Sequence, residues 1–248
     1  MKTITLSILL VCLSMTVNDT WAMGTSTQEK FLTSLLNKTV EKEISVERAV
    51  SSLLKLYPEL HESTINIALA EYPNNYQQII RGTLKADPNY ASIVIKQALS
   101  HEVAQCTDII KYAINEEPAY ADDIVITASK LHPNERDGIF ITALQTKPVV
   151  ANSVITRIIH QYPDDFGQLM NIAFTELPNK LPSLLESLFA NFEDNKEQIV
   201  TAAIASSDKD QVRVIVDMAV KAGLTEETAI QVAIKAGADE AKFAHTNE

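Results

Sequence analysis

Apolar residues recur along this chain with a period of 15 residues, counted from Glu43. The seventh residue after each point of this lattice is apolar in all thirteen repeats, and the tenth is alanine in eight of them. Positions three and four residues apart share one face of a helix, whereas a strand would need alternation. Each repeat therefore predicts one helix of about 11 residues. The thirteen apolar residues are Val50, Ile65, Ile80, Ile95, Ile110, Val125, Phe140, Ile155, Met170, Leu185, Val200, Ile215 and Ile230.

Prolines mark the joints of this pattern, because eight of the nine prolines lie on lattice points. Proline fits the first turn of a helix and breaks the interior, so each is expected to open a helix. Only Val103 interrupts the run. The eight are Pro58, Pro73, Pro88, Pro118, Pro133, Pro148, Pro163 and Pro178. The residues that follow five of them are candidate caps, namely Asn74, Asn89, Asn134, Asp164 and Asn179.

The last repeats lack proline and carry other start and stop signals. Asp194 with Glu197, and Thr225 before two glutamates, suit the starts of helices. Gly223 and Gly237 suit the ends of the last two helices, since glycine readily adopts the left-handed conformation found there.

Helices this short are unstable alone in water and must bury their apolar stripes on neighbours. Short connections make consecutive helices antiparallel, so pairs form 30-residue hairpins that stack. The sequence thus predicts an all-α protein, an α-solenoid of about thirteen short antiparallel helices over residues 43–237. An N-terminal capping helix is expected over 23–42, with a capping box from Ser26 to Glu29, and a flexible tail over 238–248.

The joints carry a resemblance to known repeats. Tyr72–Asn75 reads Tyr-Pro-Asn-Asn and Asp87–Tyr90 reads Asp-Pro-Asn-Tyr, similar to the Asp-Pro-Asn joints of tetratricopeptide repeats. The equal helices resemble short HEAT-like hairpins, although the 30-residue pair is shorter than the tetratricopeptide unit of about 34 residues. The resemblance implies a solenoid that binds partners and assigns no role to individual residues.

The N-terminus predicts export. A basic residue precedes a 14-residue stretch, Ile4–Val17, of apolar residues with Thr and Ser, which is typical of a secretory signal peptide over 1–22. Cleavage is expected after Ala22, with Gly24 as the second choice. The stretch is shorter than the roughly 18 to 20 residues that cross a bilayer. A periplasmic or extracellular location follows if the source is bacterial, with no membrane span in the mature chain.

Composition excludes several function classes. With 21 basic and 32 acidic residues the net charge is −11, which disfavours nucleic acid as a partner. No phosphate loop, serine elbow or zinc spacing is present, so we expect no cofactor, no metal and no enzymatic activity. Cleavage leaves Cys106 as the single cysteine, which is interpreted as buried filler.

Arg81, Lys96 and Lys111 form a candidate basic set. They occupy the eighth position of three successive repeats and are candidates for contact with an anionic partner. Alternate helices face opposite layers, so Arg81 and Lys111 are expected to share a face that Lys96 does not.

Ile126 and Ile141 occupy the same position in the next two repeats, and Tyr112 lies beside that position. Two interpretations stay open: an exposed apolar patch for a partner, or burial between the layers.

These patterns favour an exported, non-enzymatic scaffold or adaptor that binds a protein or an envelope polymer. One alternative is an accessory protein or enzyme acting on peptidoglycan or polysaccharide, since superhelical arrays resemble the non-catalytic part of some lytic transglycosylases. The repeats leave no residues for a separate catalytic domain. Another alternative is a structural matrix or surface component.

Overall fold

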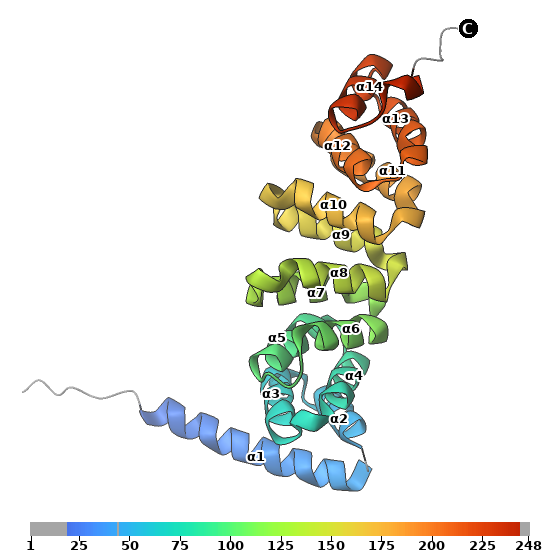
Figure 1. The fold of residues 1–248 in the computed structure, drawn as a ribbon. Helices are drawn as coiled ribbons and strands as arrows, with labels where there is room; N and C mark the ends of the chain where they lie inside the picture. Colours follow the sequence, from blue (N-terminus) through green and yellow to red (C-terminus); the bar gives the residue numbers. More distant parts are fainter. Residues whose placement is uncertain (1–18, 44, 244–248) are drawn as a thin grey trace, which may run out of the picture.

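The computed structural model describes residues 19–43 and 45–243, and these residues form helices and turns without a strand. Within them fourteen α-helices follow one another (Figure 1). They are α1 (Asp19–Glu43), α2 (Val46–Leu56), α3 (His61–Glu71), α4 (Tyr76–Ala86), α5 (Ala91–Ser100), α6 (Cys106–Glu116), α7 (Ala121–Leu131), α8 (Arg136–Thr146), α9 (Ala151–Gln161), α10 (Phe166–Glu176), α11 (Leu181–Asn191), α12 (Lys196–Ser206), α13 (Val212–Lys221) and α14 (Glu226–Lys235). The thirteen predicted helices are confirmed as α2 to α14.

The helices alternate between two layers of one solenoid (Figure 1). Helices two apart in sequence pack side by side, as α2 does on α4 and α5 on α7. We call α2, α4, α6, α8, α10, α12 and α14 the even layer, and α3, α5, α7, α9, α11 and α13 the odd layer. One connected hydrophobic core runs between the layers, and Ile65, Ile110 and Phe140 are fully buried in it. The apolar stripe read from the sequence is therefore the surface on which the layers meet.

Each lattice proline opens a three-residue 3-10 turn that leads directly into the next α-helix. The residue before proline is excluded from the helical region, and Tyr57, ahead of Pro58, accordingly has φ −132° and ψ 63°. Its N–H still donates to the carbonyl of Leu53 at 2.8 Å, which closes the last turn of α2. Proline thus ends one helix and starts the next.

The cap predictions at the proline joints are wrong. The five Asn and Asp residues predicted as caps lie inside the 3-10 turns, and none of their side chains accepts a backbone N–H bond there. The turn satisfies such donors with its own backbone, as when Leu60 N–H donates to the Tyr57 carbonyl at 3.0 Å. Asp194 is also inside a turn, Glu193–Asn195, rather than at a cap. Asp87, which precedes proline, does accept the N–H of Asn89.

The signals in the last two helices are confirmed. Thr225 accepts a backbone N–H bond at the start of α14, and Gly223 and Gly237 follow α13 and α14 with φ of 102° and 106°. Sequence reasoning missed Asp208, which stands on the lattice point before α13 and forms a capping box with Gln211. A polar cap thus replaces proline at this joint.

Val103, where proline is missing, changes the joint between α5 and α6. No 3-10 turn lies here, α5 is one residue shorter than its neighbours, and Glu102 has φ 50°. A left-handed residue turns the chain where proline does so elsewhere.

The N-terminal helix α1 packs on α2 and α3 through Leu32 and Leu36, each 1% exposed. It begins at Asp19, earlier than the capping helix predicted from residue 23, and Ser26 lies inside it. The capping box predicted at Ser26 is therefore wrong. Most of the predicted signal peptide, residues 1–18, lies outside the described residues, and the predicted cleavage point after Ala22 falls within α1.

The tail predicted over 238–248 follows Gly237, the glycine after α14. Within the tail predicted from residue 238, Glu240–Phe243 forms a 3-10 turn and Phe243 is buried against the core. Residues 244–248 lie outside the described residues.

Candidate binding surfaces

Arg81 of α4 joins three helices of the even layer. Its guanidinium donates two hydrogen bonds to the Glu116 carboxylate of α6, at 2.8 and 2.9 Å, and lies 3.6 Å from the Glu47 carboxylate of α2. It also lies 5.6 Å from the ring centroid of Tyr112. Arg81 and Tyr112, two of the predicted partner-binding residues, thus contact each other, and the charge of Arg81 is balanced within the fold.

The protonation states in this cluster are fixed by its contacts. The hydrogen bond from Arg81 lowers the pKa of the Glu116 carboxyl, because it stabilises the ionised form. Burial, with a smaller effect from Glu116, raises the pKa of Tyr112 to about 12. The carboxylate stays ionised and the phenol stays protonated at neutral pH, as expected of a structural ion pair.

Lys111 and Lys96 are both exposed and form no ion pair among the described residues. Lys111 is on α6, which packs beside the α4 helix of Arg81, whereas Lys96 is on α5 in the odd layer. The three basic residues therefore do not form one continuous patch.

Ile126 and Ile141 lie in different layers. Ile126 on α7 is 7% exposed and belongs to the core, and Ile141 on α8 is partly exposed. Burial, one of the two interpretations left open, describes Ile126. The two side chains do not build a shared exposed patch.

Two grooves run between neighbouring helices of the even layer. One, of about 460 Å³, lies between α6 and α8 and is lined by Thr107, Asp108, Lys111, Thr142, Gln145 and Thr146. The other, of about 480 Å³, lies between α10 and α12, where its polar lining includes Asn171, Asn195, Gln198 and Thr201. We call these two the even-layer grooves. Hydroxyl and amide groups, which donate and accept hydrogen bonds, dominate both polar linings.

The even-layer grooves were missed at the sequence level because their walls come from residues about 30 positions apart. The signal was nevertheless present: Lys111 and Thr142 stand at the eighth and ninth positions of repeats on adjacent even helices. Polar residues at these outward positions, compared every 30 residues, would have located the α6–α8 groove.

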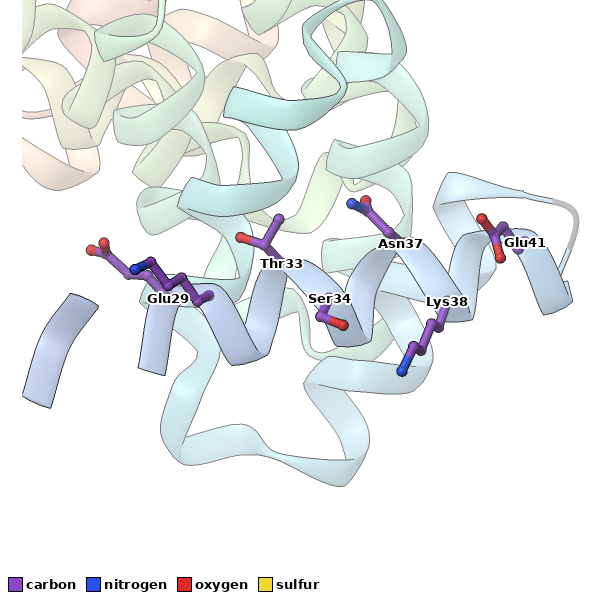
Figure 2. Close-up of a pocket in the computed structure, with 7 residues that line it drawn as sticks. Glu29, Thr33, Ser34, Asn37, Lys38 and Glu41 are labelled. Atoms are coloured by element: carbon purple, nitrogen blue, oxygen red, sulfur yellow. The ribbon is translucent and has the colours of Figure 1, made fainter. Parts of the chain in front are cut away.

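A third hollow, of about 700 Å³, follows the outside of α1 (Figure 2). All its lining residues come from this single helix: Glu29, Lys30, Thr33, Ser34, Asn37, Lys38 and Glu41. Asn37 accepts a hydrogen bond from the Tyr72 hydroxyl at 2.7 Å, which ties α1 to the end of α3. This hollow is a polar helix surface without a second wall among the described residues.

A fourth hollow, also of about 700 Å³, lies between α11 and α13 of the odd layer, and we call it the odd-layer groove. Its floor is apolar and its edge is charged. The floor consists of Phe189, Ala190, Val214, Met218 and Ala222, and the edge of Glu186, Glu193, Lys196 and Lys221. Its lining therefore combines an apolar floor with charges of both signs.

The potentially reactive side chains have structural surroundings. Cys106 is buried in α6, and burial raises the pKa of its thiol to about 11, so the thiol is protonated at neutral pH. His61 stacks on Tyr90 with ring centroids 4.7 Å apart, and His101 makes a 2.7 Å hydrogen bond with Asn66. These contacts stabilise joints between neighbouring repeats.

Comparison with protein-family models, with curated proteins and with solved structures gives no match in any of the three. Across residues 19–43 and 45–243, no helix has both the length and the apolar character needed to cross a bilayer. In the same part of the chain, no three His, Cys, Asp or Glu side chains are grouped so as to hold a metal ion.

Proposed function

We propose that this protein is an exported, non-enzymatic helical-repeat scaffold or adaptor that binds another protein or an envelope polymer along its even layer. The observation that carries the proposal is the pair of even-layer grooves, which have similar volumes and similar polar linings. Solenoids offer long surfaces of this kind to extended partners. The resemblance of the Asp87–Tyr90 joint to tetratricopeptide joints supports the same function.

The chemistry of the grooves favours a polar, extended partner. Thr, Asn and Gln side chains can donate to and accept from either peptide groups or sugar hydroxyls. Lys111 adds a positive charge without an ion-pair partner among the described residues, so an anionic group on the partner fits beside it. The α10–α12 groove lies two even-layer helices beyond the α6–α8 groove, a distance of about 20 Å at the usual helix spacing. One partner strand must therefore be extended to occupy both grooves.

Export is part of the proposal and rests on the predicted signal peptide. Trp21 is the sole tryptophan, so cleavage after Ala22 removes all indole fluorescence from the secreted protein. Secreted protein that retains tryptophan emission, with a mass that includes residue 21, would contradict this cleavage.

The test of binding compares matched variants on the two layers. Immobilised wild-type protein is incubated with the envelope fraction of its source, and bound protein and glycan are quantified. We expect Lys111→Glu combined with Gln198→Arg to reduce capture at least tenfold, because both changes fall in even-layer grooves. Lys96→Glu is the control, since Lys96 has the repeat position of Lys111 on the odd layer and should leave capture unchanged.

Two results would contradict the proposal. Equal capture by the even-layer variant and the wild type would show that the even-layer grooves do not form the binding surface. Release of soluble fragments from peptidoglycan or polysaccharide by the purified protein, in a zymogram, would show an enzyme instead.

A further inference from the structure

The odd-layer groove lies where two ring-bearing residues are replaced by alanine. At the preceding junction, His160 of α9 and Phe192 at the end of α11 fill the space between their helices, with ring centroids 4.9 Å apart. Thirty residues later the same two repeat positions hold Ala190 and Ala222, and both alanines line the groove. The hollow therefore occupies space that aromatic rings fill one junction earlier.

The floor of the groove exposes apolar surface that other junctions bury. Val214 on α13 is 44% exposed, whereas Leu184, at the same repeat position on α11, is 1% exposed. Leaving apolar surface in water costs about 25 cal/mol per Å², so covering this floor favours association. An apolar hollow with a charged edge is typical of a docking site.

The charges at the edge are available to a partner. Glu186 and Glu193 belong to the α11 side of the groove, and Lys196 and Lys221 to the α12 and α13 side. Among the described residues none of these four side chains forms an ion pair or a hydrogen bond. A complementary partner therefore carries an apolar ring, positive charge toward the glutamates and negative charge toward the lysines.

The same chain carries such a surface on α1. Phe31 is 59% exposed, and it is the exposed phenylalanine among the described residues. Lys38 and Lys42 follow at spacings of seven and eleven residues, which place them on the side of the helix that carries Phe31. Glu41 flanks this stripe, and all three charged residues are exposed.

We propose that a second copy of this chain is the occupant: α1 of one molecule docks in the odd-layer groove of the next. Phe31 enters the space left by Ala190 and Ala222. Lys38 and Lys42 approach the glutamates on the α11 side. Helix α1 lies at one end of the solenoid and α13 near the other (Figure 1), so the contact is head to tail. Each added copy leaves one groove and one α1 free, so assembly continues as an open chain.

This association uses the odd layer and is independent of the partner binding proposed for the even layer. One ring and a few exposed ion pairs make a small interface, so we expect a dissociation constant on the order of micromolar or weaker. Sedimentation velocity of the purified protein, from about 1 to 500 µM, measures it. The expected result is a sedimentation coefficient that rises with concentration past the dimer value.

Two variants each block one side of the contact. Phe31→Ser removes the ring, and Ala190→Phe fills the groove from an exposed position on α11. Each alone should stay monomeric. Mixed in equal amounts they should form a dimer and nothing larger, because one copy retains the groove and the other retains α1. Val149→Ser is the control, since this 79% exposed residue lies outside both surfaces and its change should leave association intact.

Three outcomes would overturn the proposal: a wild-type monomer at every concentration, undiminished association of Phe31→Ser, or a mixture that fails to form the dimer. Circular dichroism checks that the variants fold. If Ala190→Phe unfolds, a charge exchange replaces it: Glu186→Lys with Glu193→Lys in one copy, and Lys38→Glu with Lys42→Glu in the other. Each of these variants alone should stay monomeric. Their mixture should again associate past the dimer, because both contacts between unlike copies pair opposite charges. Failure of that exchange would also overturn the proposal.

Discussion

Two consecutive junctions of the odd layer differ in how their space is filled. Between α9 and α11, Phe192 contacts His160 and meets the ring of Phe166 edge-on at 5.6 Å, and it is 8% exposed. Between α11 and α13, Ala190 and Ala222 leave a hollow of about 700 Å³. Leu185 of α11 and Ile215 of α13 are both fully buried, whereas Val214 and Met218 of α13 remain exposed or partly exposed. The centre of the apolar stripe therefore holds the layers together, and residues at its margin decide whether a junction closes.

The backbone differs with the side chains. Phe192 ends α11 with φ −133° and ψ 63°, close to the angles of Tyr57 and Tyr162 before their proline joints. Ala222, in contrast, stays helical and Gly223 turns the chain. The even layer holds the opposite extreme: a Cβ added at Gly82 would lie 2.4 Å from the Glu47 carbonyl oxygen, so α2 and α4 are in backbone contact there. Junctions built from the same repeat length therefore differ. The junction between α2 and α4 is closed by backbone contact, the one between α9 and α11 is filled by rings, and the one between α11 and α13 is open.

The largest expected effect comes from emptying the filled junction. Phe192→Ala removes a buried ring and leaves a cavity, so we expect the free energy of unfolding to fall by about 3 to 4 kcal/mol. Urea denaturation measures it. Val214→Ala at the open junction is the comparison and should cost less than about 1 kcal/mol, since this side chain is already half in water. Equal losses would mean that the two junctions do not differ energetically.

Gly82→Ala tests the closed junction. The new methyl group meets the Glu47 carbonyl, which belongs to a backbone and cannot rotate away, so α2 and α4 must separate. We expect a loss of about 1 to 3 kcal/mol in the free energy of unfolding, typical of overpacking. Gly138→Ala in α8, where nothing lies within 4 Å, should instead stabilise by about 0.5 to 1 kcal/mol. A neutral Gly82→Ala would contradict the close approach.

Rebuilding the missing rings tests what opens the groove. Ala190→His with Ala222→Phe restores the ring pair of the previous junction, and we expect a gain of about 1 kcal/mol in the free energy of unfolding. Thermal denaturation of the double variant and of each single variant separates the pair from its parts. If the double variant is no more stable than the wild type, the hollow depends on the direction in which the chain leaves α13 at Gly223 rather than on the absent rings.

The smallest effect concerns a junction held by charge, between α4 and α6. The pKa of Glu116 is lower in the folded state, so its ion pair stabilises above the unfolded-state pKa of about 4.3 and is lost as pH falls through the folded-state value. Glu116→Gln should cost less than about 1 kcal/mol at pH 7, and the difference should shrink as the pH falls through the folded-state pKa of Glu116. Denaturation at several pH values measures it. Glu186→Gln, which removes an exposed carboxylate, is the control and should leave the free energy of unfolding unchanged at pH 7.

The sequence foresaw the candidate surface only in part. It marked Lys111 as outward and set Lys96 on the opposite layer, because both follow from counting positions within one repeat. It did not foresee that Arg81 pairs with Glu116, 35 residues away. The hydrogen bonds of His101 with Asn66 and of Ser206 with Asn171 also span 35 residues, so this separation is a usable signal for contacts between neighbouring helices of one layer.

The sequence alone determined the helices, their number after α1 and the places where they end, because these depend on interactions within a few residues: an apolar stripe, a proline that excludes helix before it, a glycine that accepts positive φ. Tertiary structure decided which junctions close. Whether rings at His160 and Phe192 meet, or alanines leave a hollow, depends on side chains about 30 residues apart and on the direction in which the backbone leaves each helix. Local periodicity carries no information about that direction. The docking surfaces arise at the junctions that this direction and these side chains leave open.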